Sequence, residues 1–264
     1  MRISIIQTDI VWEDKSENLR YLREKLETLR GTTEIAVLPE MFSTGFSMDT
    51  ARLAEDADGE TIATLRQWSR ELGLAITGSY MAREADSSGS APAYYNRAFF
   101  LTPEDDAFYY DKRHLFRMGR ETECFTSGNK RPIISYRGWK ILLLVCYDLR
   151  FPVWSRNIDN EYDLLIYVAN WPASRRKAWD ILLQARALEN QSYVCGVNRV
   201  GTDGHRLRHD GGSVIYSPKG ELLACVPDNE EGTATATLEH STLTTFRDKF
   251  PAWKDADSFK ITLL

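Results

Sequence analysis

The sequence contains few of the residues that build a metal site, a disulfide framework or a nucleic-acid surface. Its four cysteines are far apart, with no CxxC pair and no histidines at ligand spacing: Cys124, Cys146, Cys195 and Cys225. This spacing argues against zinc and disulfide frameworks. The 33 basic and 38 acidic residues are well mixed and give a net charge of −5, so no basic face for nucleic acid is evident. We expect no metal, no cofactor and no nucleic-acid partner.

Long hydrophobic runs are also missing. No apolar stretch approaches the roughly 20 residues that a bilayer-spanning helix requires. Residues 1–8 lack the apolar core and small-residue cleavage site of a signal peptide. We therefore expect a cytoplasmic protein with no membrane partner. A chain of 264 residues can bury a full hydrophobic core without disulfides or a metal. No repeat or strong linker is visible, which predicts one domain over residues 1–264. The polar segment 84–91 is expected to be an exposed hairpin loop.

Short apolar runs alternate with helical patterns along most of the chain, which predicts a layered α/β protein. Strands are expected at Ile3–Gln7, Ile35–Leu38, Leu74–Gly78, Ala98–Leu101, Ile141–Cys146, Leu164–Ala169 and Tyr193–Asn198. Helices are expected from the capping box at Asp14 to Gly31, over Glu60–Leu72, and after Ser174 with Ala178, Ile181, Leu182, Ala185 and Leu188 inside. Antiparallel strands are expected at Ser213–Tyr216, Glu221–Val226 and Thr233–Leu238.

Three of the predicted strands end in residues that can carry out chemistry together. Glu40 follows the apolar run 35–38, Lys112 follows an aromatic run, and Cys146 ends the continuous apolar run 140–145. Ligands of α/β proteins usually bind where strands end. A thiol needs a base to become a nucleophilic thiolate, and a nearby carboxylate can serve. A fixed ammonium can stabilise the oxyanion that then develops. The combination predicts a cysteine-nucleophile enzyme.

These fragments resemble the signature of the nitrilase superfamily of carbon–nitrogen hydrolases, in which Cys146 starts a Cys-Tyr-Asp-x-Arg-Phe-Pro elbow. The resemblance covers nearly the whole chain. It implies a four-layer αββα sandwich, pairing into a homodimer through a helical face, and Glu40, Lys112 and Cys146 as catalytic residues. It also implies a second catalytic glutamate before a glycine, for which Glu121 is expected and Glu123 is the alternative.

Residues 168–173, together with the elbow, resemble the omega-amidase branch of this superfamily. The resemblance implies hydrolysis of the terminal amide of 2-oxoglutaramate or 2-oxosuccinamate, small-molecule amides, with ammonia as the product. Such a substrate needs a cation for its distal carboxylate and apolar walls. We expect the cation to be Arg175 or Arg176, and the substrate-binding walls and oxyanion amide to come from Phe42, Phe116, Trp171 and Tyr147.

Several alternatives remain open at the level of sequence. The substrate could be an N-carbamoyl amino acid or a deaminated peptide, which a larger and more open cavity would favour. The chain could also be a catalytically idle binding module, although the presence of all four catalytic residue types argues against this. Arg150 is expected to be a structural partner of Asp148 or of nearby carbonyls. The polar loop Asp203–His209 has no assigned role.

Overall fold

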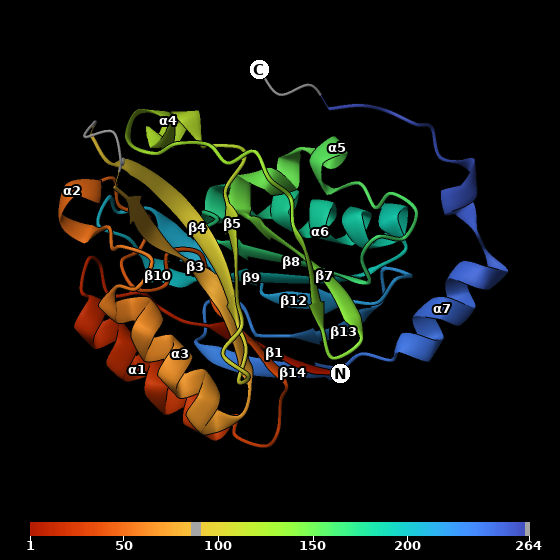
Figure 1. Cartoon of the computed structure of the whole chain (residues 1–264), viewed down its shortest axis with the longest axis horizontal. Coiled ribbons are helices and arrows are strands. Elements are labelled where there is room, and N and C mark those ends of the chain that lie inside the picture. Colours follow the sequence, from red (N-terminus) through yellow and green to blue (C-terminus); the bar gives the residue numbers. More distant parts are fainter. Residues whose placement is uncertain (86–90, 262–264) are drawn as a thin grey trace.

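Two six-stranded mixed sheets lie face to face in the computed structural model, which describes residues 1–85 and 91–261 (Figure 1). The first sheet has the order β14-β1-β2-β3-β4-β5, with β1 at Arg2–Gln7, β2 at Ile35–Val37, β3 at Ala75–Glu84, β4 at Ala93–Leu101, β5 at Ala107–Asp111 and β14 at Gly232–Thr237. The second has the order β13-β12-β9-β8-β7-β6, with β6 at Ile133–Tyr136, β7 at Trp139–Val145, β8 at Leu164–Ala169, β9 at Tyr193–Asn198, β12 at Val214–Tyr216 and β13 at Leu222–Cys225.

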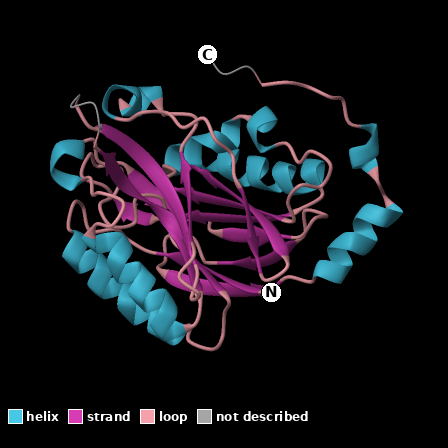
Figure 2. Cartoon of the chain, viewed as in Figure 1, coloured by secondary structure: helices cyan, strands magenta, loops and turns pink. Residues whose placement is uncertain are grey.

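Helices cover the outer faces of both sheets, so the predicted four-layer αββα sandwich is confirmed (Figure 2). Helices α1 at Lys15–Thr28 and α3 at Glu60–Leu72 lie on the first sheet, and α6 at Arg176–Asn190 lies on the second. The inner faces of the two sheets share one core cluster, in which Ile5 and Val37 of the first sheet pack with Leu142 and Leu144 of the second. Burial of these aliphatic side chains is the main force that holds the layers together.

The remaining elements are short and lie at the ends of the sheets. They are α2 (Thr50–Leu53), α4 (Glu121–Cys124), α5 (Pro152–Ser155), α7 (His240–Lys249), the ribbon β10 (Val200–Thr202) and β11 (Arg208–Asp210), and 3-10 helices η1 (Arg117–Gly119), η2 (Cys146–Arg150), η3 (Ala173–Arg175) and η4 (Ala252–Asp255). No helix in residues 1–85 or 91–261 has the length and apolar character needed to cross a bilayer. Part of the predicted hairpin loop 84–91 lies outside the described residues.

The first helix begins as its sequence predicts. The Asp14 side chain accepts a hydrogen bond from the Glu17 N–H at 3.0 Å, which satisfies one of the free amides of the first turn. The expected inner stripe of α6 is only partly confirmed: Ala178 and Leu182 pack against the core, but Ile181 and Leu188 are 55% and 52% exposed. The buried residues of the helix are Trp179, Leu183, Arg186, Ala187 and Asn190. This helix has apolar residues on both faces, so periodicity alone placed part of the stripe on the wrong face.

The three C-terminal strands are antiparallel to their neighbours, as expected, but they belong to different sheets. β12 pairs with β9 and β13 in the second sheet, whereas β14 crosses back and pairs with β1 in the first. The parallel strands β7, β8 and β9 therefore lie inside the second sheet, and β2 lies inside the first. The segments that follow β2, β5, β7 and β8 converge at one end of the sandwich and build the site.

Candidate active site

Cys146 occupies a strained turn at the end of β7. Its φ is +44°, a left-handed conformation that non-glycine residues rarely adopt. The strand stops at Val145, and the 3-10 helix η2 starts at the cysteine itself. The turn is held by Asp148, whose Oδ2 accepts a hydrogen bond from the Val145 N–H at 3.0 Å. Strain of this kind is stable only where the surrounding structure fixes it, and such positions cluster at functional sites.

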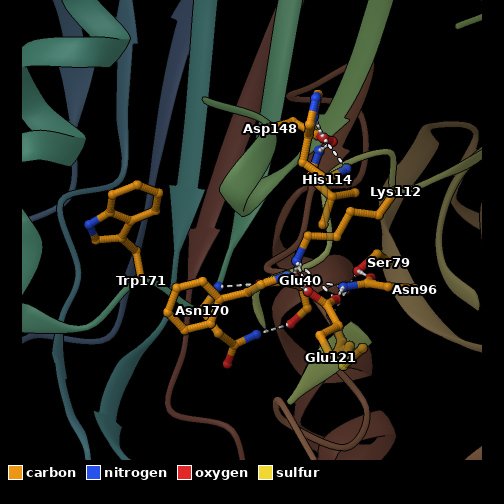
Figure 3. Close-up of polar contacts among 12 residues, drawn as sticks. Glu40, Ser79, Asn96, Lys112, His114, Glu121, Asp148, Asn170 and Trp171 are labelled. Carbon is orange, nitrogen blue, oxygen red and sulfur yellow. Dashed lines mark hydrogen bonds and ion pairs between the residues drawn. The ribbon is translucent and has the colours of Figure 1, made fainter. Parts of the chain in front are cut away.

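Asp148 also joins the cysteine turn to the segment that carries Lys112. Its wholly buried carboxylate accepts hydrogen bonds from the Tyr110 hydroxyl at 2.8 Å, the His114 N–H at 3.0 Å and His114 Nδ1 at 2.8 Å (Figure 3). The His114 ring stacks on Phe151 at a centroid distance of 3.8 Å. One carboxylate thus fixes the loop after β5 against the loop after β7. The expectation that Arg150 partners Asp148 is wrong, because these donors occupy the carboxylate.

Lys112 is buried between two glutamates. Its Nζ donates to Glu40 Oε1 at 2.9 Å, and to Glu121 Oε1 and Oε2 at 3.0 and 2.9 Å (Figure 3). Burial lowers the pKa of Lys112, but the charges of Glu121 and Glu40 outweigh burial and raise that pKa above its usual range. Lys112 therefore stays charged. Glu123, the alternative loop glutamate, is exposed and pairs with Arg120.

Glu121 has donors at every acceptor position of its carboxylate. Oε1 accepts from Lys112 and from Asn96 Nδ2 at 2.9 Å, and Oε2 accepts from Lys112 and from the Phe116 N–H at 2.6 Å. Burial raises the pKa of Glu121. A carboxylate has about four lone-pair sites, however, and all of them face donors, so no place for a proton remains. Glu121 is ionised and holds the ammonium of Lys112.

Glu40 is wholly buried and is fixed by two asparagines in addition to Lys112. Asn96 Nδ2 donates to Glu40 Oε1 at 2.7 Å, and the Asn170 N–H donates to Glu40 Oε2 at 2.8 Å (Figure 3). The Asn170 side chain also donates to the Glu40 main-chain carbonyl. The residue that follows, Met41, has a φ of +44°, so the chain turns sharply immediately after the glutamate.

The Cys146 thiol is a weak acid in this environment. Burial raises the pKa of Cys146 well above its usual range, and the charge of Glu40 raises it further, while Lys112 opposes the shift. Without a base, the resting form near neutral pH is the thiol. The arrangement can therefore supply a nucleophile only if a neighbouring group removes the proton.

A cavity of about 580 Å³ opens above these residues. Lys112, Cys146 and Asn170 belong to its lining, while Glu40 and Glu121 lie behind them. Phe116, Tyr147, Trp171 and Arg175 line it as well. Further lining comes from residues that the sequence did not single out for this site: Trp12, Phe46, Met48, Met118, Arg150, and Asp203, His205, Leu207 and His209 of the unassigned polar loop.

Two expected wall and cation residues lie elsewhere. Phe42 is absent from the cavity lining and packs edge-on against Phe99 in the core under α1 and α3, because the turn at Met41 redirects the chain. Arg176 is also outside the lining: it bonds Asp180 at 2.6 Å and Asp228 at 2.9 Å on the far side of the helix start. These two predictions are corrected by the structure.

Three arginines line the cavity, and one of them, Arg120, is paired with Glu123. The Arg150 guanidinium lies 5.0 Å from the ring centroid of Trp171, and that of Arg175 lies 5.0 Å from the ring centroid of Phe116. Within residues 1–85 and 91–261, neither guanidinium forms an ion pair with a carboxylate. Stacking on an aromatic face leaves the edge of a guanidinium available for a planar anion. Besides Lys112 and the paired Arg120, the cavity therefore presents two arginines that are available to bind an anion.

Asn96 and Asn170 are the main site residues that sequence reasoning missed. Asn96 lies inside β4, and Asn170 directly follows β8. The position of Asn170 after a buried strand was an available signal, of the same kind that selected Cys146. Asn96 gave no such signal, because its partners come from the segment after β2 and from α4, far away in the chain.

This fold and site are those of a carbon–nitrogen hydrolase: the family profile matches residues 2–248, and the chain belongs to this family. It is similar to omega-amidase YafV of Escherichia coli strain K12, with 44% identity over 99% of this chain and 98% of the relative. It is also similar to 2-oxoglutaramate amidase of Bacillus subtilis strain 168, with 29% identity over 96% of each chain.

Solved structures of carbon–nitrogen hydrolases and amidases have the same fold. A CN-hydrolase superfamily protein from Xanthomonas campestris, with an arsenic adduct in its active site, superposes with a TM-score of 0.94 at 39% identity over 99% of both chains. An amidase mutant from Nesterenkonia sp. AN1, whose active-site cysteine has added acrylamide, gives 0.80 at 25% identity over 96% of this chain and 98% of that chain. The fold expected from the sequence is thereby confirmed.

Proposed function

We propose that the protein is an omega-amidase that hydrolyses the terminal amide of a small 2-oxo dicarboxylic acid, such as 2-oxoglutaramate or 2-oxosuccinamate. The observation that carries this proposal is that Arg150 and Arg175, on the cavity that contains Cys146, have no carboxylate partner in the described part of the chain. Guanidinium groups bind carboxylates with paired, charge-assisted hydrogen bonds. The names of the Escherichia coli and Bacillus subtilis relatives support the same substrate class.

The acids that line the cavity favour a 2-oxo acid over an amino acid. Glu13 binds the Ser47 hydroxyl at 2.6 Å, Asp49 binds Arg52 at 2.8 Å, and Asp203 accepts from two backbone amides of its own loop. Each of these carboxylates already has a partner. An α-ammonium group would be desolvated in the cavity without a matched anion, which is costly. Glutamine and asparagine are therefore expected to be poor substrates.

The reaction begins with proton transfer from Cys146 to Glu40. Glu40 Oε1 already accepts from Lys112 and Asn96, whereas Oε2 accepts only from the Asn170 N–H. Because each carboxylate oxygen has two lone pairs, Oε2 is the atom that takes the proton. The sulfur then attacks the amide carbon. The oxyanion is held by Lys112 and by the Tyr147 N–H, which lies in the first turn of η2, where amides lack intrahelical partners.

In the remaining steps, Glu40 first gives its proton to the leaving ammonia and then takes a proton from water. Glu40 returns the proton to the amide nitrogen, the C–N bond breaks, and ammonia leaves a thioester on Cys146. Glu40 then removes a proton from water, which attacks the thioester carbon, and the C–S bond breaks. The proton returns to the sulfur and the dicarboxylate is released. Glu121 holds Lys112 during both steps and, with all its acceptor positions filled, does not contact the substrate.

The proposal is tested by ammonia release from 2-oxoglutaramate, measured beside glutamine, asparagine and N-carbamoyl-β-alanine. We expect turnover of the keto acid amide to exceed that of both amino acids by at least about a hundredfold, because an unpaired buried charge costs several kcal/mol. Equal rates with glutamine would contradict the substrate assignment while leaving the catalytic residues in place.

A second candidate substrate class is favoured by the size of the cavity. A volume of about 580 Å³ is in the range of cavities that hold drug-sized ligands, and a five-carbon acid does not fill it. Met118 and Leu207, which line it, are 70% and 49% exposed. A larger amide, such as an N-carbamoyl amino acid or a deaminated peptide, would use this apolar rim. Faster turnover of such an amide would favour this candidate.

We also propose that two copies pair through the face formed by α5 and α6. Large apolar side chains are exposed there: Val153, Ile158, Ile181 and Leu188 are 54%, 45%, 55% and 52% exposed. Monomers rarely leave large apolar patches in water. Sedimentation of the wild type and of Ile181→Glu tests the dimer, and a wild type that sediments as a monomer would contradict it.

A cytoplasmic location is proposed from the cysteines. All four are free in the structure, as expected for a chain kept in a reducing compartment. Cell fractionation is the direct test, and recovery of the protein outside the cytosol would contradict this proposal.

A further inference from the structure

Asn96 connects the two buried glutamates of the site. It lies in β4, is wholly buried, and uses its side-chain amide nitrogen to donate to Glu40 Oε1 at 2.7 Å and to Glu121 Oε1 at 2.9 Å (Figure 3). An asparagine amide has two hydrogens, so each glutamate receives one. No proton of this amide is left for a substrate.

The orientation of the Asn96 amide is set by chemistry. Asn96 Oδ1 lies 2.9 Å from Ser79 Oγ, and Ser79 Oγ lies 2.9 Å from the Met41 N–H. Since a backbone N–H can only donate, the Ser79 hydroxyl accepts there and gives its own hydrogen to Asn96 Oδ1. The NH₂ group is thereby directed at the two carboxylates, which are acceptors only, with no hydrogen to donate, when ionised.

We propose that Asn96 is a positioning residue that directs the proton of the reaction onto Oε2 of Glu40 and keeps this glutamate ready to act as a base. The proposal rests on the role of Glu40 in the proposed function. Asn96 and Lys112 together fill Oε1, and Oε2 keeps one free lone pair for the proton. Without Asn96, Oε1 would regain a lone pair, and the proton could be held on Oε1 instead of Oε2.

The loss of Asn96 should also change the pH dependence of the reaction. The charged and titratable groups that face Glu40 are Lys112 after β5, Glu121 in α4, Cys146 after β7 and His209 in β11. Asn96 stabilises the ionised form of Glu40 more than the protonated form, because hydrogen bonds to a charged acceptor are stronger. Its removal therefore favours the protonated form, and the acidic limb of the pH profile moves to higher pH.

The experiment compares Asn96→Ala and Ser79→Ala with the wild type and with Asn157→Ala. Asn157 is a matched control, because it is a buried asparagine whose amide donates to two carbonyls, of Tyr162 and Asn190, outside the site. For each protein, kcat and KM are measured against pH with whichever amide is turned over. Alkylation of Cys146 by iodoacetamide, read by mass spectrometry at that residue, is measured over the same pH range.

For Asn96→Ala we expect the acidic limbs of kcat/KM and of alkylation to move up by about one pH unit, the usual worth of a hydrogen bond to a charged group. kcat should fall by about tenfold or more, with KM little changed. Ser79→Ala should shift both limbs in the same direction by less. Asn157→Ala should lower the melting temperature and leave both limbs in place.

An Asn96→Ala protein that loses activity with its acidic limb unmoved would overturn the proposal, since a merely structural asparagine would behave in this way. If Asn96→Ala does not fold, Ser79→Ala decides: an unmoved limb overturns the proposal and a raised limb supports it. His209 is a second titratable group close to Glu40, so the profiles are repeated with His209→Asn, where the shift must persist. The alkylation data do not depend on the substrate, so an error in the substrate class is distinguished from an error in the role of Asn96.

Discussion

The ammonium of Lys112 lies within 3.0 Å of both carboxylate oxygens of Glu121. The lysine is thereby held at the cavity floor by a residue that does not line the cavity. Release of one of these two contacts would free an N–H for the oxyanion of the reaction, so the pair links the buried charge network to the chemistry.

The role of Glu121 can be tested with its neighbour in the same short helix. Glu121→Gln keeps the shape but places a donor against the Lys112 and Phe116 donors. We expect kcat to fall by about a hundredfold, as when an oxyanion donor is misplaced, and stability to fall by about 3 kcal/mol, since a buried pair is broken. Glu123→Gln removes only an exposed ion pair with Arg120. It should therefore leave both kcat and the free energy of unfolding close to those of the wild type. If Glu121→Gln and Glu123→Gln had equal effects in ammonia-release and urea-unfolding assays, the role of Glu121 would be misassigned.

The nucleophile can be tested by substitution and by labelling. Cys146→Ala should abolish ammonia release and leave the melting temperature close to that of the wild type. Because burial raises the pKa of the Cys146 thiol, alkylation near neutral pH should depend on Glu40 as the base, and we expect loss of this base to outweigh loss of the Glu40 charge, which also raises that pKa. Glu40→Gln should slow iodoacetamide labelling by at least about tenfold near pH 7, with recovery as the pH is raised. Labelling of Cys146 no faster than that of buried Cys195 would favour the idle binding module instead.

Much of the site could be predicted because its residues follow buried strands. Glu40, Lys112 and Cys146 each come at or near such a strand end, and strand ends from both sheets meet at one end of the sandwich. Glu121 was marked instead by the family resemblance, through its distance to Gly128. These signals depend on short-range pattern and on the topology of parallel strands, both of which are visible in one sequence.

The side chains that were misplaced depend on backbone turns and long-range partners. Phe42 follows a left-handed residue, Met41, and so enters the core instead of the cavity. Arg175 and Arg176 are adjacent in sequence, yet only Arg176 forms ion pairs with aspartates in the described residues. Its partners are Asp180 in α6, Asp210 in β11 and Asp228. Such partners are determined by the tertiary fold and cannot be predicted from a local sequence pattern.

These two arginines provide a matched pair for testing carboxylate recognition. Arg175→Met keeps the stem on Phe116 and removes the charge, so KM for 2-oxoglutaramate should rise by about tenfold or more, the worth of one charge-assisted hydrogen bond. Arg176→Met breaks ion pairs outside the cavity and should leave KM unchanged. Steady-state kinetics at fixed pH are sufficient. If Arg176→Met raised KM as much as Arg175→Met, the cation of the cavity would be misassigned.

His209 should make the stability of the protein depend on pH. Burial, followed by the charge of Arg199, lowers the pKa of His209 from 6.5 to about 4. Between pH 6.5 and about pH 4, His209 is therefore protonated in the unfolded chain and neutral in the folded chain. The stabilisation is complete above pH 6.5 and is lost as the pH falls toward 4, by about 3 kcal/mol in total at 1.36 kcal/mol per unit.

The measurement is urea unfolding of the wild type and of His209→Asn at pH 7.5 and pH 4.5. Other carboxylates titrate in both proteins, so only the difference between their pH dependences reports on His209. We expect the wild type to lose about 2 to 3 kcal/mol more than the variant between these pH values. Asparagine keeps a polar side chain of similar size but cannot take up a proton in this range. Equal losses would mean that His209 is solvated or paired in solution, and that its ring is not the buried neutral group that faces the cavity.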